Sequence, residues 1–141
     1  SPTEISQRIE VIRRRDAYEN DTAAFLKRWR AADTRLRKKI LAAKEALPAL
    51  ETPDQTLIDC AELCIALGSD GLRGELTLLR AARAVAAFEG ATEVTRAHLR
   101  KIAPSALRHR LRRDPLDDSG STTRVSRAMG ELFGSFLTAA E

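Results

Sequence analysis

The chain has 141 residues, of which 43% are hydrophobic and only 4% aromatic, and its 24 basic residues exceed its 20 acidic ones by four. This composition suits one folded domain and excludes a disordered or fibrous chain. A membrane span is also excluded, because no run approaches roughly 18 uninterrupted apolar residues.

The first 50 residues predict two helices. Isoleucines recur at helical spacing over residues 3–18, and the basic run Arg13-Arg14-Arg15 suits a helix end. Asn20-Asp21-Thr22 predicts a break and an N-cap before a second helix that reaches about Leu47. Ala31-Ala32-Asp33 is a candidate interruption of that second helix.

A linker bracketed by Pro48 and Pro53 precedes the next helix. Thr52-Pro53-Asp54-Gln55 predicts a capping box with proline at the first helical position, and Gly68 is expected to end the helix. The side chains expected to face inward are Leu57, Ile58, Ala61, Cys64 and Ile65.

Two further helical patterns follow. The first occupies residues 72–89, between the turn Gly68-Ser69-Asp70-Gly71 and Gly90, with Leu72, Leu76, Leu79, Ala82, Val85 and Ala86 on its buried side. The second begins after Thr95, ends at Asp114-Pro115 and contains Pro104, which should kink or split it. Its packing residues are Leu99, Ile102, Ala103, Ala106, Leu107 and Leu111.

A loop over residues 117–121 leads into a last amphipathic helix from about Thr122, with Val125, Met129, Leu132, Phe133 and Phe136 on its apolar face. Because no strand-period run exceeds four residues, we predict an all-α bundle of five to six helices. We divide it into a helical pair at 1–50, a helical core at 51–113, and a loop with a C-terminal helix at 114–141.

The modest net charge conceals blocks of opposite sign. Residues 1–50 and 96–113 are basic, 51–95 and 114–141 are acidic, and nineteen of the 24 bases are arginine, which suits paired contacts to carboxylate or phosphate. The blocks fit either an anionic partner or pairing with one another, within a bundle or between subunits.

Autonomous catalysis is not indicated. The sequence has no Gly-x-x-x-x-Gly-Lys-[Ser/Thr] phosphate loop, so we expect this chain alone to be inactive as an ATPase. Cys60 and Cys64 lack two further metal ligands at suitable spacing and lie among apolar neighbours, so buried free thiols in a reducing cytoplasm are expected.

Arg73 is the best candidate binding residue. It follows a glycine-rich turn and occupies the first turn of the helix over 72–89, where free N–H groups and the helix dipole favour an anion. The alternative is that Arg73 only pairs with Asp70 or Glu75.

The segment Gly-Leu-Arg-Gly-Glu-Leu-Thr-Leu-Leu-Arg-Ala-Ala-Arg-Ala at 71–84 resembles the second sensor motif in the lid domain of AAA+ ATPases. More narrowly, it is similar to the ATPase subunit I of magnesium chelatase in bacteriochlorophyll-making phototrophs. Further stretches resemble the C-terminal part of that subunit, namely 8–16, 60–70, 107–117, Gly120-Ser-Thr122 and Arg124-Val125.

The resemblance implies an AAA+ lid with an N-terminal helical extension. It implies an upstream nucleotide-binding module that holds ATP and Mg²⁺, in a parent that forms hexameric rings and works with chelatase subunits D and H to insert Mg²⁺ into protoporphyrin IX. Arg73 falls on the second sensor arginine, which contacts the γ-phosphate of ATP. Ser1 then looks like a cut near a domain boundary.

The remaining arginines are candidate interface residues. Arg80 and Arg83 continue one side of the sensor helix, and Arg108, Arg110, Arg112 and Arg113 form a basic set that we expect at an interface within the ring. The alternatives are a MoxR-type chaperone lid, a membrane-surface patch, or a basic nucleic-acid-binding module; we expect no nucleic-acid partner.

Overall fold

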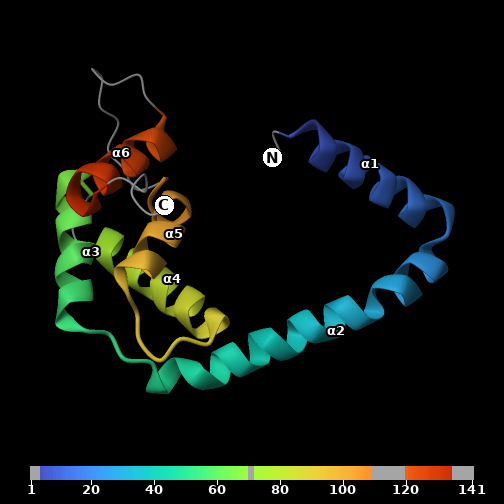
Figure 1. The fold of residues 1–141 in the computed structure, drawn as a ribbon, viewed down its shortest axis with the longest axis horizontal. Coiled ribbons are helices and arrows are strands. Elements are labelled where there is room, and N and C mark those ends of the chain that lie inside the picture. Colours follow the sequence, from blue (N-terminus) through green and yellow to red (C-terminus); the bar gives the residue numbers. More distant parts are fainter. Residues whose placement is uncertain (1–3, 70–71, 109–119, 135–141) are drawn as a thin grey trace, which may run out of the picture. The chain divides into compact units, whose positions relative to one another are not determined.

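The computed structural model describes residues 4–69, 72–108 and 120–134. They form six α-helices and one short 3-10 helix and contain no strand, which confirms the predicted all-α class. None of these helices is both long and apolar enough to cross a membrane. The chain divides into two compact units, residues 1–41 and 42–141 (Figure 1).

The first unit contains α1 (Ile5–Asn20) and most of α2 (Thr22–Ala46). The predicted N-cap between them is confirmed, because Asp21 Oδ1 accepts a 2.9 Å hydrogen bond from the backbone N–H of Ala24. Three aromatic rings pack in sequence at this junction, with centroids 5.6 Å apart for Tyr18 and Phe25 and 5.9 Å apart for Phe25 and Trp29.

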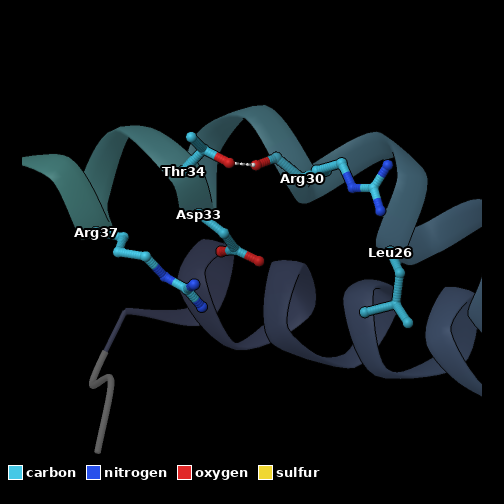
Figure 2. Close-up of a pocket in the computed structure, with 5 residues that line it drawn as sticks. All are labelled: Leu26, Arg30, Asp33, Thr34 and Arg37. Atoms are coloured by element: carbon cyan, nitrogen blue, oxygen red, sulfur yellow. Dashed lines mark hydrogen bonds between the residues drawn. The ribbon is translucent and has the colours of Figure 1, made fainter.

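The candidate interruption at residues 31–33 is wrong, since α2 is continuous from Thr22 to Ala46. Alanine is the strongest helix former, and Asp33 is exposed, so neither residue type requires the helix to break there. Asp33 instead lies beside a hollow of about 450 Å³ on α2, which is also lined by Leu26, Arg30, Thr34 and Arg37 (Figure 2).

The first unit leaves much apolar surface uncovered. Helix α1 has no buried residue, and the only buried residue of α2 is Ala43, which belongs to the second unit. The exposed apolar side chains of these two helices include Ile5, Ile9, Val11 and Ile12 in α1 and Leu26, Leu36, Ile40 and Leu41 in α2.

The second unit begins with the end of α2 and the 3-10 helix Leu47–Ala49. The connection to α3 (Asp54–Ala66) runs beside the connection before α5, because Glu51 donates to the Thr92 carbonyl at 3.1 Å and accepts from Val94 N–H at 2.9 Å. Thr56 Oγ1 adds a buried 2.7 Å hydrogen bond to the Val94 carbonyl.

The predicted capping box at the start of α3 is wrong. Pro53 has the extended backbone of a cap residue and accepts the first hydrogen bonds through its carbonyl, from the N–H groups of Thr56 and Leu57. The cap therefore lies one residue later than expected, at a proline that has no side-chain acceptor, and Thr52 Oγ1 is buried without a hydrogen-bond partner.

The predicted inward face of α3 is confirmed at Cys64, is partly buried at Ala61, and is wrong at Leu57, Ile58 and Ile65. The buried residues are Thr56, Asp59, Cys60, Leu63 and Cys64, whereas Leu57, Ile58 and Ile65 are 42%, 49% and 76% exposed. Two polar residues can lie inward because each has a hydrogen-bond partner. Thr56 donates to the Val94 carbonyl, and Asp59 accepts from Arg96.

Helix α4 (Arg73–Glu89) packs through small residues. Ala82 and Ala86 are buried as predicted, but Leu72 and Leu76 are exposed, and Gly74, Leu78 and Ala87 are buried instead. A Cβ atom on Gly74 would lie 1.9 Å from Ser69 Oγ, so this glycine allows the chain before α4 to approach it closely. Gly90 ends α4 in the left-handed conformation, as predicted.

Helix α5 (Arg96–Leu107) begins after Thr95, as predicted, and the Thr95 N–H donates to His98 Nδ1 at 2.9 Å. Pro104 does not split the helix: the buried side chains Leu99, Ala103 and Leu107 hold the turns on either side of it. The predicted continuation through Leu111 to Asp114-Pro115 lies outside the described residues.

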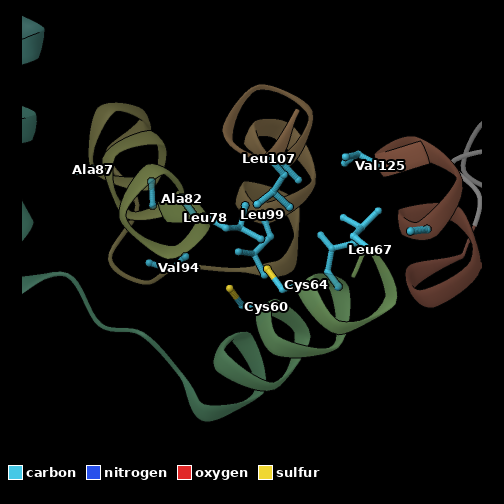
Figure 3. Close-up of a cluster of buried hydrophobic side chains, with 14 of the residues drawn as sticks. Cys60, Cys64, Leu67, Leu78, Ala82, Ala87, Val94, Leu99, Leu107 and Val125 are labelled. Atoms are coloured by element: carbon cyan, nitrogen blue, oxygen red, sulfur yellow. The ribbon is translucent and has the colours of Figure 1, made fainter. Parts of the chain in front are cut away.

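Helix α6 (Ser121–Phe133) starts within one residue of the expected position and buries Val125 completely, while Leu132 is 40% exposed. The predicted Phe136 lies outside the described residues. The core of the second unit lies among α3, α4, α5 and α6 (Figure 3). Its fully buried apolar members include Leu63, Cys64, Leu78, Val94, Leu99, Leu107 and Val125.

Candidate functional site

Arg73 is the first residue of α4, and its side chain is exposed. The helix behind it is fixed by Gly74, which lies close to Ser69 and Cys64, and by the fully buried Leu78. The predicted anchor Leu76 is half exposed, so the packing that orients Arg73 comes from a neighbouring face of the helix. The arrangement presents a guanidinium beside the N-terminal N–H groups of a helix, a setting that favours phosphate or carboxylate.

Pairing between Arg73 and Glu75 is not found in the described part of the chain. Glu75 is partly buried, and its Oε2 atom is shielded from solvent without a hydrogen-bond partner. Its backbone carbonyl accepts a weak 3.6 Å hydrogen bond from Cys60 Sγ. Asp70, the other expected partner, lies outside the described residues. The Arg73 guanidinium is therefore not occupied by Glu75.

The other arginines of α4 differ from each other. Arg80 is exposed two helical turns after Arg73, on the same side of the helix. Arg83 is partly buried, and its Nη2 atom donates to the Leu47 carbonyl at 3.1 Å. Arg83 therefore ties α4 to the 3-10 helix at the start of the second unit.

The basic set after α5 is described only at its first member. Arg108 is exposed and directly follows the last helical residue, Leu107. Arg110, Arg112 and Arg113 lie outside the described residues. The structure thus brings Arg73 and Arg80 onto one surface of α4 and gives Arg83 a contact within the unit.

An ion pair between Asp59 of α3 and Arg96 of α5 was not predicted from the sequence. Asp59 is 2% exposed and accepts two 2.7 Å hydrogen bonds from Arg96, at Nε and Nη2, and a 3.0 Å bond from Gln55. These bonds, the one from Arg96 above all, hold the pKa of Asp59 below its usual value despite the opposing effect of burial. The pair fixes α3 against α5, and Asp59 is one of three acids in α3, so its position alone gave no sign that it is buried.

Phe133 of α6 lies between two arginines of α5. The Arg96 guanidinium carbon is 4.9 Å from the Phe133 ring centroid, and that of Arg100 is 5.5 Å from it. Arg100 also donates to the backbone carbonyls of Phe133 and Gly134. The C-terminal end of α6 is therefore held on α5 by cation–π contacts and by hydrogen bonds.

The two cysteines are buried free thiols, as predicted. The neighbouring Cys60 thiol and burial together raise the pKa of Cys64, so this thiol stays protonated. In the part of the chain that the structure describes, no three His, Cys, Asp or Glu side chains group closely enough to hold a metal ion.

Comparison with known proteins identifies this helical unit. The sequence model of the AAA lid domain matches residues 58–128, which include all of α4 and α5 and parts of α3 and α6. Over 132 residues the chain is 63% identical to the magnesium-chelatase 38 kDa subunit of Cereibacter sphaeroides, covering 94% of this chain and 40% of that protein. Over 131 residues it is 62% identical to the same subunit of Rhodobacter capsulatus, covering 93% and 37%.

A solved structure titled as a complex between subunits BchI and BchD of magnesium chelatase is 60% identical, with a TM-score of 0.40, and the match covers 82% of this chain and 36% of that one. The curated relatives confirm the resemblance to subunit I of magnesium chelatase, and they do not favour a MoxR-type lid or a nucleic-acid-binding module. The chain spans about 40% of the length of the curated relatives that it matches. It belongs to the AAA lid domain family.

Proposed function

We propose that the chain is the lid of an ATPase subunit of magnesium chelatase, which uses ATP to drive insertion of Mg²⁺ into protoporphyrin IX for bacteriochlorophyll synthesis. The observation that carries this proposal is the 63% identity over 132 residues to a magnesium-chelatase 38 kDa subunit. Because the chain corresponds to about 40% of that subunit and has no phosphate loop, it contributes the lid and not the hydrolytic centre.

Arg73 is the proposed sensor of nucleotide. Its exposed guanidinium at the start of α4 fits a phosphate group, to which it can donate two charge-assisted hydrogen bonds. ATP and its Mg²⁺ would be held by the rest of the subunit, and the lid would add this one cationic contact. Loss of the γ-phosphate removes the contact, so the position of the lid depends on the state of the nucleotide.

The proposed partners follow from the same assignment. The relatives are named as subunits, so the protein that carries this lid is expected to work with further chelatase subunits, D and H, and with copies of itself in a hexameric ring. Arg80 and Arg108 are exposed and available for contacts in such a ring, as is proposed for Arg110, Arg112 and Arg113. Arg83 is the weaker candidate, because it already donates to the Leu47 carbonyl.

Exchange of the lid tests the proposed function. The matched 132 residues of the Cereibacter sphaeroides 38 kDa subunit are replaced by those of this chain, and ATP-dependent Mg²⁺ insertion is measured with the other chelatase subunits. We expect the chimera to retain at least about a tenth of the parent rate, since most side chains are unchanged.

The control is a subunit cut before the exchanged residues, which should be inactive. A chimera that folds and binds ATP but inserts no Mg²⁺ would contradict the assignment of this lid to magnesium chelatase.

A further inference from the structure

We infer that the exposed strip of α2 in one copy of the chain docks on the outer face of α3 in a second copy. The two surfaces are the basic strip, made by Leu26, Arg30, Asp33, Arg37 and Ile40, and the acidic face, made by Asp54, Ile58, Glu62 and Ile65. This contact would be one by which copies join in the proposed ring, so its role rests on the proposed function. The surfaces that support it are observed independently of that function.

The basic strip is a continuous line along one side of α2. Its members are spaced by four, three, four and three residues, so they stay on one face of the helix for almost four turns. All five are exposed, with Leu26 54% and Ile40 45% accessible. Arg30 and Arg37 line the hollow of about 450 Å³ on this face (Figure 2).

The two arginines of the strip are open to an outside partner. Neither side chain has a hydrogen bond or ion pair in the described residues, and neither pairs with Asp33, which lies between them. The strip therefore carries a net positive charge, and the apolar side chains Leu26 and Ile40 flank its two arginines.

The acidic face has the matching properties on α3. It lies on the side opposite the buried residues, and its apolar members Ile58 and Ile65 are 49% and 76% exposed. Asp54 and Glu62 are both exposed and form no ion pair in the described part of the chain. Covering Ile58 and Ile65 in a contact would add hydrophobic stabilisation to the ion pairs.

The spacing of the charges agrees between the two surfaces. At about 1.5 Å of rise per residue, Arg30 and Arg37 are separated by about 10.5 Å along α2, and Asp54 and Glu62 by about 12 Å along α3. Two packed helices can therefore form both ion pairs at once and cover apolar side chains on each surface. Because this chain carries both surfaces, a second copy always offers a partner with complementary charge at the matched spacing.

The contact joins different surfaces of identical chains, so it is head-to-tail. Each copy keeps one free basic strip or one free acidic face after pairing, and repeated contacts close into a ring or extend as a filament. It involves no nucleotide, which makes it separable from ATP sensing by Arg73.

Sedimentation of the 141-residue chain without nucleotide tests the contact. We expect association that weakens at least about tenfold between 50 and 500 mM salt, because screening weakens exposed ion pairs. The double variant Arg30→Glu with Arg37→Glu should associate at least about tenfold more weakly. The matched control, Lys27→Glu with Lys38→Glu, makes the same charge change on another side of α2 and should associate as the unchanged chain does.

Charge exchange makes the test specific. Asp54→Lys with Glu62→Lys should also weaken self-association, and mixing this variant with Arg30→Glu, Arg37→Glu should restore it, because opposite charges again face each other. Far-UV circular dichroism checks that each variant is helical.

A chain that stays monomeric up to about 1 mM, or association that is equally sensitive to the control variant, would overturn the inference. So would binding of an oligonucleotide that the Arg30→Glu, Arg37→Glu variant loses, in the absence of self-association. Since no ATP or chelatase activity is measured, these outcomes do not depend on whether the proposed function is correct.

Discussion

Asp59 and Arg96 form the one buried ion pair described in the second unit. Asp59 is nearly inaccessible, whereas the Arg96 side chain remains 45% exposed, so water partly screens the pair and its strength lies mainly in the two 2.7 Å hydrogen bonds. Without Arg96 the carboxylate would be a buried charge without compensation, so we expect the fold to be sensitive to a change at Asp59.

Asp59→Asn should lower the free energy of unfolding by about 1–3 kcal/mol at pH 7. The asparagine NH₂ group replaces one of the two carboxylate oxygens that accept hydrogen bonds from Arg96. Since the folded-state pKa of Asp59 is lowered, its contribution is full above the unfolded value of about 4 and is lost as pH falls through the folded pKa. Urea unfolding at pH 7 and at pH 3 should therefore show a smaller difference between the two chains at pH 3.

Asp54→Asn is the control for this prediction, since Asp54 is exposed on the same helix and has no ion pair in the described residues. We expect it to change stability by no more than about 0.5 kcal/mol. Equal effects of the two substitutions at pH 7 would contradict the role given to Asp59.

The wrong predictions of which α3 side chains face inward share one cause. Hydrophobicity placed Leu57, Ile58 and Ile65 inside α3, but the polar residues Thr56 and Asp59 are buried because distant residues supply their hydrogen bonds. Partners separated by 37 or 38 residues in the chain leave no periodic signal in the helix itself. Arg73, in contrast, was found at the start of its helix as expected, because the glycine-rich turn before it is a local signal.

Helix boundaries were the most predictable elements. Gly68 and Gly90 have positive φ angles beyond the ends of α3 and α4, and Asp21 and Thr95 precede α2 and α5, all as expected. These residues act on the adjacent backbone alone, so the sequence suffices. The face that each helix buries depends on its neighbours, which explains why Leu72 and Leu76 of α4 were misplaced.

The two arginines Arg83 and Arg80 of α4 should differ in their contribution to stability. Arg83→Ala should lower the free energy of unfolding by about 1 kcal/mol, because it removes the hydrogen bond to the Leu47 carbonyl and leaves that acceptor without its partner. Arg80→Ala should change it by less than about 0.5 kcal/mol, since its side chain is exposed. Thermal unfolding of both variants checks this, and equal destabilisation would contradict the difference between the two arginines.

The whole molecule consists of a compact lid and a helical extension with little core of its own. Among residues 4–69, 72–108 and 120–134, the sixteen buried apolar residues all lie at position 43 or later, within the second unit. The sequence predicted this extension as a helical pair that ends at residue 50. That boundary stays a prediction. The contacts within the structure divide the chain after Leu41.

A chain of residues 42–141 should therefore unfold cooperatively, with a midpoint within a few degrees of the full chain, because no core residue is removed. Circular dichroism during heating measures this. A non-cooperative transition for the shortened chain would show that the first unit is needed for the fold of the second.

The central claim is that this lid senses nucleotide through Arg73 in a magnesium chelatase. The most direct test is ATP-dependent Mg²⁺ insertion by a longer subunit carrying this chain, with Arg73→Ala compared to Arg35→Ala, a matched change at an exposed arginine of α2. We predict that Arg73→Ala lowers the insertion rate at least about tenfold without changing the unfolding midpoint, because an exposed charge-assisted contact to phosphate is lost while the core is untouched. Arg35→Ala should stay within about twofold of the parent. Normal insertion by the Arg73→Ala subunit would contradict the claim.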